Sequence, residues 1–321
     1  MSRHQLNRQQ IEDALRSLGI AYEARWGSDP IQVHFCSYFA QERNGFYFWE
    51  AQNAEHPVFA HADIIVLASR EWPGSELIGD VILVEHPQAV YYMLMRHFLD
   101  EPASATPAIH PTAIIAPSAS IGRNAVIGPY CVIEDDCVIG DQAKLDSHVV
   151  VKKGSVIGHR THIESHSTIG ATGVAWVWYE GQRIRQPQIG GAVVGDDCFL
   201  GTDITIVRGS INEVTSLGRG CVLAHGTKIG HGCRVGEDVH FANNVSIAGN
   251  CTIGDRAFLS AASVLRPRIS LARGVVVGAG AVVTRNVNEE FVVVSGVPAR
   301  RMDIKEHHAG VPRLSGAHPN R

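Results

Sequence analysis

The fold is decided by residues 126–170, which read VIGPYCVIEDDCVIGDQAKLDSHVVVKKGSVIGHRTHIESHSTIG. An aliphatic residue returns at every sixth position of this stretch. The same period covers residues 109–169, resumes over 194–206 and runs again over 217–283, with an interruption before each restart. A period that covers most of the chain predicts a repeat architecture.

A period of six fits neither an amphipathic helix, which repeats about every 3.6 residues, nor a half-buried strand, which alternates. It fits a short strand and a turn, repeated around a prism, so that three hexapeptides make one coil of 18 residues. Successive coils then stack at the strand spacing of about 4.8 Å. Glycine often follows the aliphatic residue, as at Gly122 and Gly128, and we expect it to permit the tight turn. The period therefore predicts a mainly β chain that forms a parallel β-helix.

We predict that the fourth position after each aliphatic residue holds a second, smaller side chain that faces inward, as at Ala125 and Ser155. Six of the seven cysteines occupy this position, and they are Cys131, Cys137, Cys198, Cys221, Cys233 and Cys251. We expect these thiols to pack as small buried hydrophobic groups and to form neither disulfides nor zinc sites. Only Cys36 lies outside the pattern.

The hexapeptide itself has an aliphatic residue, glycine or a similar residue, two variable residues, a small residue and one more. Over residues 107–302 it resembles the repeat of the hexapeptide-repeat acyltransferase superfamily. That resemblance implies a left-handed β-helix and a homotrimer. The predicted parts are a small α/β domain at 1–100, a linker at 101–108, the β-helix at 109–302 with loops at 170–193 and 207–216, and a disordered tail at 303–321.

The domain in front of the repeats is predicted from its local patterns. Helices are expected at 9–18 and 91–98, and strands at 46–49, 64–68 and 81–84.

Two segments of this domain, GFYFWEAQN and ILVEHPQAVYYMLMRHF, are similar to the N-terminal pattern of the UDP-3-O-acylglucosamine N-acyltransferases of lipid A biosynthesis. The resemblance implies a uridine-binding domain, in which Phe46, Phe48 and Trp49 stack on the nucleotide base. Two alternatives stay open: these rings form the core of a small domain, and the domain only caps the first coil of the β-helix.

Two residues carry the predicted chemistry. Acyl transfer from a thioester to an amine needs a base and a donor for the oxyanion of the tetrahedral intermediate. His231 lies in IGHGC, and Gly249 follows 18 residues later, which predicts that they stack in successive coils. The lipid A acyltransferases have a histidine in a similar context, and the resemblance implies His231 as general base and the Gly249 N–H as oxyanion donor. The alternative is a solvent-facing turn histidine.

Further candidates for substrate binding follow from the columns and from the interruptions. His225 and Asn243 form a column on a neighbouring face, and Arg208 is expected in the coil before His231 as a ligand of substrate phosphate. Loop anchoring is the alternative for Arg208. The aromatic residues of the first interruption either cover the sugar or pack between subunits, and they are Trp176, Trp178 and Tyr179.

The superfamily resemblance implies that the acyl donor lies along the C-terminal coils, where arginines supply positive charge for the phosphates of CoA. The candidate donor-binding residues are Ala261, Ala279, Arg266, Arg268, Arg285 and Arg300. His148 and His166 are expected to stack next to Tyr130 as a solvated ladder.

These features predict an N-acyltransferase that uses acyl-CoA and the amine of a nucleotide-linked amino sugar, in the biosynthesis of cell-surface polysaccharide or lipopolysaccharide. A short acyl chain is favoured, because the ending VVVSGVPARRM resembles sugar N-acetyltransferases that use acetyl-CoA. The alternatives are a UDP-3-O-acylglucosamine N-acyltransferase that depends on acyl carrier protein, a γ-type carbonic anhydrase with zinc, and a silent scaffold. Six-residue spacing places His225 and His231 on different faces, which argues against three converging zinc ligands.

Composition limits the remaining classes of function. A net charge of −4 and a pI near 6.5 give no field for binding nucleic acid. The polar N-terminal segment lacks the apolar region of a signal peptide, and no apolar stretch is long enough to span a membrane. We therefore expect a cytoplasmic enzyme with no metal site and no permanently bound cofactor.

Overall fold

The computed structural model describes residues 5–28, 30–50, 59–72, 80–99 and 108–302. Nearly all of the predicted linker and the whole predicted tail lie outside these residues. The chain divides into two compact units, 1–105 and 106–321, and each is described by itself. In the described part of the chain, no helix has the length and hydrophobicity needed to cross a bilayer.

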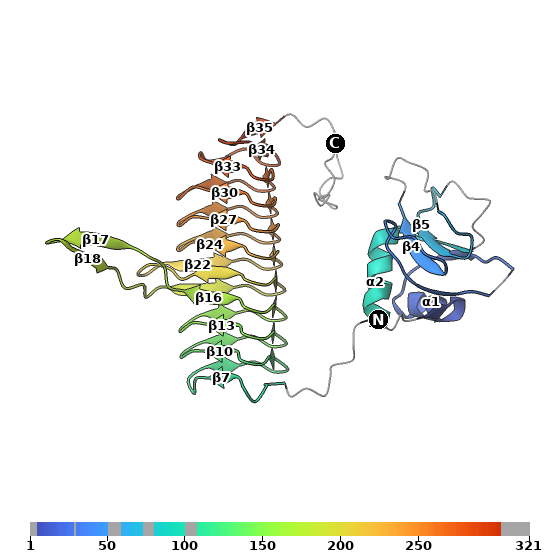
Figure 1. Cartoon of the computed structure of the whole chain (residues 1–321), viewed down its shortest axis with the longest axis horizontal. Coiled ribbons are helices and arrows are strands. Elements are labelled where there is room, and N and C mark those ends of the chain that lie inside the picture. The colour runs from blue at the N-terminus through green and yellow to red at the C-terminus, as the bar shows by residue number, and fades with distance from the viewer. Residues whose placement is uncertain (1–4, 29, 51–58, 73–79, 100–107, 303–321) are drawn as a thin grey trace. The chain divides into compact units, whose positions relative to one another are not determined.

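In its described residues, the N-terminal unit is a sheet of six strands in the order β1-β3-β4-β5-β6-β2 with two helices (Figure 1). Its elements are β1 (Leu6–Asn7), α1 (Arg8–Ser17), β2 (Glu23–Arg25), β3 (Gln32–Phe35), β4 (Gly45–Trp49), β5 (Ile65–Ala68), β6 (Asp80–Leu83) and α2 (Pro87–Leu99). Strands β3 to β6 are parallel, while β1 and β2 pair antiparallel at the two edges. The expected helices and the three expected strands are present, and β1, β2 and β3 were not predicted.

Two of the three rings that were predicted to bind a nucleotide are buried in the core of this unit. Phe46 is 0% exposed and Trp49 is 7% exposed, so neither offers a free ring face. The prediction that these two rings stack on a base is therefore wrong, and core packing is the reason. Phe48 is partly buried and packs on Tyr91, with ring centroids 5.2 Å apart.

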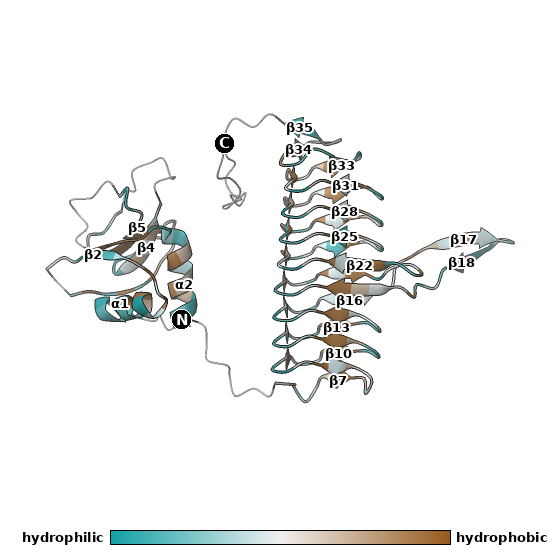
Figure 2. Cartoon of the chain, turned by 180° about the vertical axis from the view of Figure 1, so that it is seen from behind, coloured by the Kyte–Doolittle hydropathy of each residue, from teal (hydrophilic) through white to brown (hydrophobic). Residues whose placement is uncertain are grey.

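The second unit is a parallel β-helix, in which the strands of successive coils form three sheets, one on each face (Figures 1 and 2). The first sheet contains β7 (Ile114–Ile115), β10 (Val132–Ile133), β13 (Val150–Val151), β16 (Thr168–Ala171), β21 (Thr205–Val207), β24 (Lys228–Ile229), β27 (Ser246–Ile247), β30 (Val264–Leu265) and β33 (Val282–Val283). The second contains β8 (Ser120–Ile121), β11 (Val138–Ile139), β14 (Val156–Ile157), β19 (Gly191–Val194), β22 (Val214–Leu217), β25 (Arg234–Val235), β28 (Thr252–Ile253) and β31 (Ser270–Leu271). The third contains β9 (Val126–Ile127), β12 (Lys144–Leu145), β15 (His162–Ile163), β20 (Phe199–Leu200), β23 (Val222–Leu223), β26 (His240–Phe241), β29 (Phe258–Leu259), β32 (Val276–Val277), β34 (Val293–Ser295) and β35 (Arg300–Met302).

The register between coils follows the hexapeptide period. Ile133 pairs with Val151, which is 18 residues later, and the periodic aliphatic residues fill the interior. The coils keep this register across both interruptions. Ile157 pairs with Val194 across the first, and β21 pairs with β24 across the second. The fold predicted from the period is confirmed.

The small inward positions form the rest of this core. Ala125 and Ser155 are buried, and the six cysteines of the repeats are buried free thiols. Burial raises the pKa of the Cys131 and Cys137 thiols, so they remain neutral. Colouring by hydropathy shows hydrophobic residues on the strands and hydrophilic ones at the turns (Figure 2).

The glycines that follow the aliphatic residues have a different role from the one predicted. The turns are made two residues further on, by residues with positive φ such as Asn124 (55°) and Tyr130 (58°). At Gly122, a Cβ atom would lie 2.5 Å from the backbone nitrogen of Asp141 in the next coil. These glycines are therefore required by the close approach of neighbouring coils, and the expectation that they make the turn is wrong.

The two interruptions are structured excursions. In the first, β17 (Trp176–Tyr179) and β18 (Gln182–Arg185) form an antiparallel hairpin that projects away from the β-helix (Figure 1). We call this hairpin the arm. The second connects β21 to β22 and carries Arg208 and Glu213.

Candidate active site

His231 and Gly249 lie together at one corner of the β-helix. His231 follows β24 and Gly249 follows β27, and these strands are neighbours because Ile229 pairs with Ile247. A Cβ atom at position 249 would lie 2.6 Å from Nε2 of His231. The ring therefore occupies the space that any larger residue would need, and the predicted stacking is confirmed.

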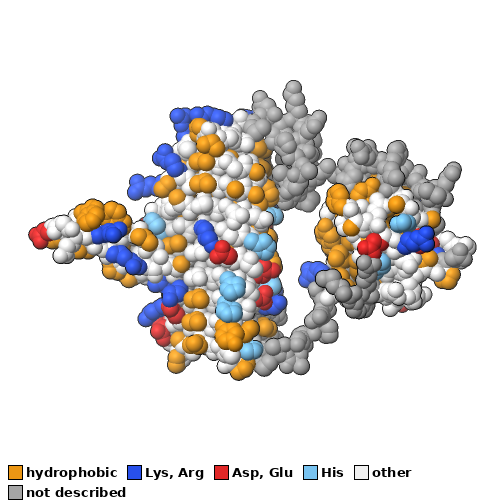
Figure 3. Space-filling view, in the orientation of Figure 1, with side chains coloured by type: hydrophobic (Ala, Val, Ile, Leu, Met, Phe, Trp, Pro, Cys, Tyr) orange, Lys and Arg blue, Asp and Glu red, His pale blue; other side chains and the backbone are white. Residues whose placement is uncertain are grey.

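A cavity of about 390 Å³ opens at this corner. It is lined by His231, Gly249, Asn250, Arg266, Pro267 and Arg268. The two arginines are exposed, and neither takes part in an ion pair with another described residue. Figure 3 shows blue Lys and Arg side chains at the C-terminal end of the β-helix. The cavity therefore combines an imidazole with positive charge that is available to an anionic ligand.

The backbone N–H of Gly249 makes no hydrogen bond to another described residue. Pro267 stacks on it from the next coil, because Ile247 pairs with Leu265, and proline has no side-chain acceptor. The N–H is thus left available to a ligand, which is the property required of an oxyanion donor.

Glu213 lies beside His231, and this contact was not predicted from the sequence. Its carboxylate Oε2 lies 3.9 Å from Nδ1 of His231, and that nitrogen is buried without a hydrogen-bond partner among the described residues. The backbone N–H of Ser210 donates to the same carboxylate at 3.3 Å. A small side-chain movement would let the carboxylate accept a hydrogen bond from Nδ1–H, leaving Nε2 as the basic nitrogen. The sequence signal that could have indicated Glu213 is its position in the second interruption, because long excursions in a solenoid often carry function.

Arg208 lies in the coil before His231, as predicted, but its hydrogen bonds are made to backbone carbonyls of earlier coils. Its guanidinium donates to the backbone carbonyl of Lys153, and its backbone N–H donates to the carbonyl of Ala171 at 2.9 Å. These contacts support the anchoring alternative, and a role in binding phosphate stays a prediction.

The column that begins at His225 occupies a different corner, as its spacing predicts. Backbone hydrogen bonds connect His225 through Asn243 and Ala261 to the turn at Ala279. Nδ1 of His225 accepts from the backbone N–H of Thr202 at 3.1 Å. Within one chain, this column and the cavity at His231 are therefore separate.

The remaining candidates lie at the surface. Trp176, Trp178 and Tyr179 are exposed on the arm, and the guanidinium of Arg183 lies 5.4 Å from the ring centroid of Trp176. Arg285 and Arg300 line a second cavity of about 290 Å³ beside the last coils.

The predicted ring ladder is present on the β-helix. His148 lies between Tyr130 and His166, with centroid distances of 5.1 and 4.9 Å.

Fold and site together define a left-handed parallel β-helix of hexapeptide repeats. Residues 245–285 match the family described as hexapeptide repeat of succinyl-transferase, and residues 103–213 match the one described as GMPPB C-terminal domain. The predicted resemblance to the hexapeptide-repeat acyltransferase superfamily is confirmed.

Relatives by sequence carry the name UDP-3-O-acylglucosamine N-acyltransferase. One from Pseudomonas aeruginosa (strain LESB58) is 36% identical over 51% of this chain and 50% of its own length. Another, from P. aeruginosa (strain UCBPP-PA14), is 39% identical over 45% of this chain and 46% of its own length. The chain spans about half the length of the curated relatives it matches.

Solved structures with the same fold include LpxA from Acinetobacter baumannii, with a TM-score of 0.56 and 32% identity over 62% of this chain and 74% of that one. The UDP-N-acetylglucosamine acyltransferase of Francisella novicida matches with a TM-score of 0.56 and 29% identity over 61% and 70% of the two chains.

Proposed function

We propose that this chain is an N-acyltransferase that moves an acyl group from a thioester to the amine of a nucleotide-linked amino sugar. The observation that carries the proposal is the imidazole of His231 packed on Gly249 in an open cavity beside two unpaired arginines. The names of the sequence relatives support the same chemistry. A protein that served only as a scaffold, without catalysis, would not need a histidine packed on glycine beside unpaired arginines.

The proposed reaction is a direct attack of the amine on the thioester carbonyl carbon. As the C–N bond forms, Nε2 of His231 accepts the proton from the nitrogen. The carbonyl oxygen becomes an oxyanion, which the free N–H of Gly249 stabilises. The C–S bond then breaks, and the proton held by His231 passes to the leaving thiolate. Glu213 acts as a positioning residue that keeps Nε2 turned towards the amine. None of these steps needs a permanently bound cofactor.

The donor is proposed to be an acyl-CoA, held through its phosphates by Arg266 and Arg268. Arginine suits this role because its planar guanidinium binds phosphate oxygens in pairs. An acyl carrier protein is the second candidate, and its phosphopantetheine would reach the same cavity. The acceptor favoured by the relatives' names is a UDP-linked glucosamine that already carries a 3-O-acyl group.

We further propose that the enzyme is a homotrimer. The arm supports this proposal, because Trp178 is 64% exposed on it and the neighbouring Val177 and Tyr179 are exposed as well. Apolar surface of this kind usually marks an interface. A trimer would also allow the His225 column of one subunit to face the cavity of the next.

The test is thiol release by the purified chain. Acetyl-CoA, 3-hydroxybutyryl-CoA and an acyl carrier protein thioester are each combined with UDP-, dTDP- and GDP-linked amino sugars, and with UDP-3-O-acylglucosamine. We expect release that requires one acceptor and that falls about 10²–10⁴-fold in His231→Ala. His159→Ala is the matched control, since His159 has the same position in its hexapeptide at another corner. It should retain full activity.

The donor that supports turnover decides between acyl-CoA and the carrier protein. Full activity in His231→Ala would exclude this histidine as the base. No release with any pair of donor and acceptor would overturn the proposed reaction.

A further inference from the structure

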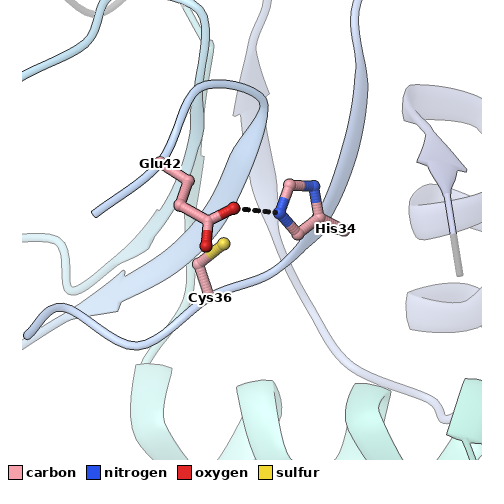
Figure 4. Close-up of side chains that lie close together, drawn as sticks. All are labelled: His34, Cys36 and Glu42. Atoms are coloured by element: carbon pink, nitrogen blue, oxygen red, sulfur yellow. Dashed lines mark hydrogen bonds and ion pairs between the residues drawn. The ribbon is translucent and has the colours of Figure 1, made fainter. Parts of the chain in front are cut away.

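Outside the candidate active site, one cluster of metal-ligand side chains converges among the described residues. It consists of His34, Cys36 and Glu42 in the N-terminal unit, and Figure 4 shows their side chains turned towards one another. One ligand atom from each, a ring nitrogen, the sulfur and a carboxylate oxygen, lies within 4.8 Å of the other two. We call these three residues the HCE cluster.

We propose that the HCE cluster binds one divalent transition-metal ion, with Zn²⁺ the best fit. No metal site was expected from the sequence, because the three side chains meet only in the folded unit. It is independent of the acyltransferase chemistry, since it concerns the other unit of the chain.

One of the three separations between ligand atoms is close to that of a tetrahedral zinc site. Nε2 of His34 lies 3.4 Å from Oε2 of Glu42. With Zn–N and Zn–O bonds of about 2.0–2.2 Å, tetrahedral geometry places such a pair about 3.4 Å apart. A Zn–S bond of about 2.3 Å would require the sulfur about 3.6 Å from each of them. The sulfur lies within 4.8 Å of both other ligand atoms, so binding requires it to approach them by at most about 1.2 Å.

The backbone holds two of the ligands on one side of a strand. His34 lies on β3 and Cys36 directly follows it, so alternation along the strand turns both side chains to the same face. The N–H of His34 donates to the carbonyl of Asn44 at 2.9 Å, and that of Cys36 donates to the carbonyl of Phe46 at 3.0 Å. The hydroxyl of Tyr91 also donates to the Cys36 carbonyl, at 2.9 Å.

The third ligand is held by Tyr47. The backbone N–H of Glu42 donates to the Tyr47 hydroxyl at 2.7 Å, and that hydroxyl donates to the carbonyl of Glu42 at 3.1 Å. The ring takes the space that a Cβ atom at position 45 would need, which explains Gly45.

The ligand types select the metal. A thiolate and an imidazole suit zinc and other borderline-soft ions and disfavour Ca²⁺ and Mg²⁺, which take oxygen ligands. The side chain of His34 is 14% exposed and that of Glu42 is 41% exposed, so an ion can enter from solvent. Three protein ligands leave the fourth position of a tetrahedron to water or to another group.

The test uses the full chain after treatment with a chelator. Co²⁺ is titrated in, and the absorption of thiolate-to-cobalt charge transfer is followed. Zn²⁺ is then added to displace the cobalt, and bound metal is counted by elemental analysis. We expect one ion per chain. We also expect no charge-transfer band in Cys36→Ser, and at least about tenfold weaker binding in His34→Ala and Glu42→Gln.

Two variants separate ligation from other effects. His86→Ala removes an exposed histidine of the same unit, which is 74% exposed, and should bind like the wild type. Tyr47→Phe keeps every ligand but removes the hydroxyl that holds Glu42, and should weaken binding less than Glu42→Gln does. Circular dichroism of each variant shows whether the unit is folded. A wild-type chain that binds no Co²⁺, or a band that persists in folded Cys36→Ser, would overturn the proposal.

Discussion

Two corners of the same β-helix differ in whether the backbone N–H groups of their turns donate hydrogen bonds to side chains of the next coil. At the corner after the second sheet, the N–H of Arg123 donates to the carboxylate of Asp141 at 2.8 Å, and the N–H of Asp141 donates to Nδ1 of His159 at 2.9 Å. We call this the capped corner. At the corner after the first sheet, Gly249 has no side chain and Pro267 has no acceptor, so the N–H of Gly249 remains free. We call this the open corner.

We infer that the same position of the repeat can serve structure or, as proposed for His231, chemistry. His159 and His231 hold the same position in their hexapeptides. At the capped corner, Nδ1 of the histidine is occupied by a backbone N–H of the coil before it. At the open corner, the equivalent N–H, that of Arg208, donates instead to the carbonyl of Ala171. His231 is thereby released from capping, and its ring is free for chemistry.

The largest effect is expected from filling the space at the open corner. In Gly249→Ala, the new Cβ would lie 2.6 Å from Nε2 of His231, so the ring must move by close to 1 Å. A displacement of about this size can cost about 10²-fold in rate. We expect kcat for thiol release to fall by about that factor while the melting temperature stays nearly unchanged.

Gly191→Ala is the matched control for this change. A Cβ atom there would meet only Val214, at an ordinary contact distance of 3.5 Å. If Gly249→Ala turned over as fast as Gly191→Ala, packing of His231 on Gly249 would have no part in catalysis.

A smaller loss is expected from making the open corner resemble the capped one. Pro267→Asp would place a carboxylate over the N–H of Gly249, as Asp141 is placed over that of Arg123. Removal of an oxyanion donor costs about 10²–10³-fold, and a competing internal acceptor should cost about 10–100-fold. The measurement is kcat beside Pro267→Ala, which adds no acceptor and should retain its rate. Equal rates in the two variants would show that the Gly249 N–H is not the donor.

A substitution at Glu213 tests whether its carboxylate orients His231 at the open corner. A carboxylate about 4 Å from an imidazolium stabilises it by about 1 kcal/mol or somewhat more when both are partly exposed, which is about five- to tenfold in rate. In Glu213→Gln we therefore expect kcat to fall by about this factor with KM unchanged, and Glu213→Asp to recover part of it. Glu237→Gln, on a capped-corner turn, is the control. A change in KM alone would assign Glu213 to substrate binding.

Most of the β-helix could be predicted, because the period fixes which residues stack. The alignment of His231 with Gly249 and the separation of the His225 column both follow from counting residues. The period also identified the buried cysteines, since the fourth position of each hexapeptide faces inward. Where a repeat sets the geometry, neighbours in space can be read from spacing.

The features that were missed lie where the period stops. Glu213 reaches His231 from an excursion whose path no spacing describes. His34 and Glu42 meet across a loop of the N-terminal unit, which has no repeat. The burial of Phe46 depends on packing from several elements at once, so an aromatic run cannot by itself distinguish a core from a binding face.

The smallest effect is expected at the capped corner, in acid. A hydrogen bond from Arg123 holds the pKa of Asp141 below its ordinary value. The stabilisation by this carboxylate is thus fully present above the unfolded pKa of about 3.9, and is lost as pH falls through the lower pKa of the folded state. The side chain is partly exposed, so we expect Asp141→Asn to melt only about 1–2 °C below the wild type at pH 6, and the difference to shrink as pH falls below about 3.9. A difference that stays constant across this range would mean that the carboxylate charge contributes nothing, and that capping acts through the hydrogen bond alone.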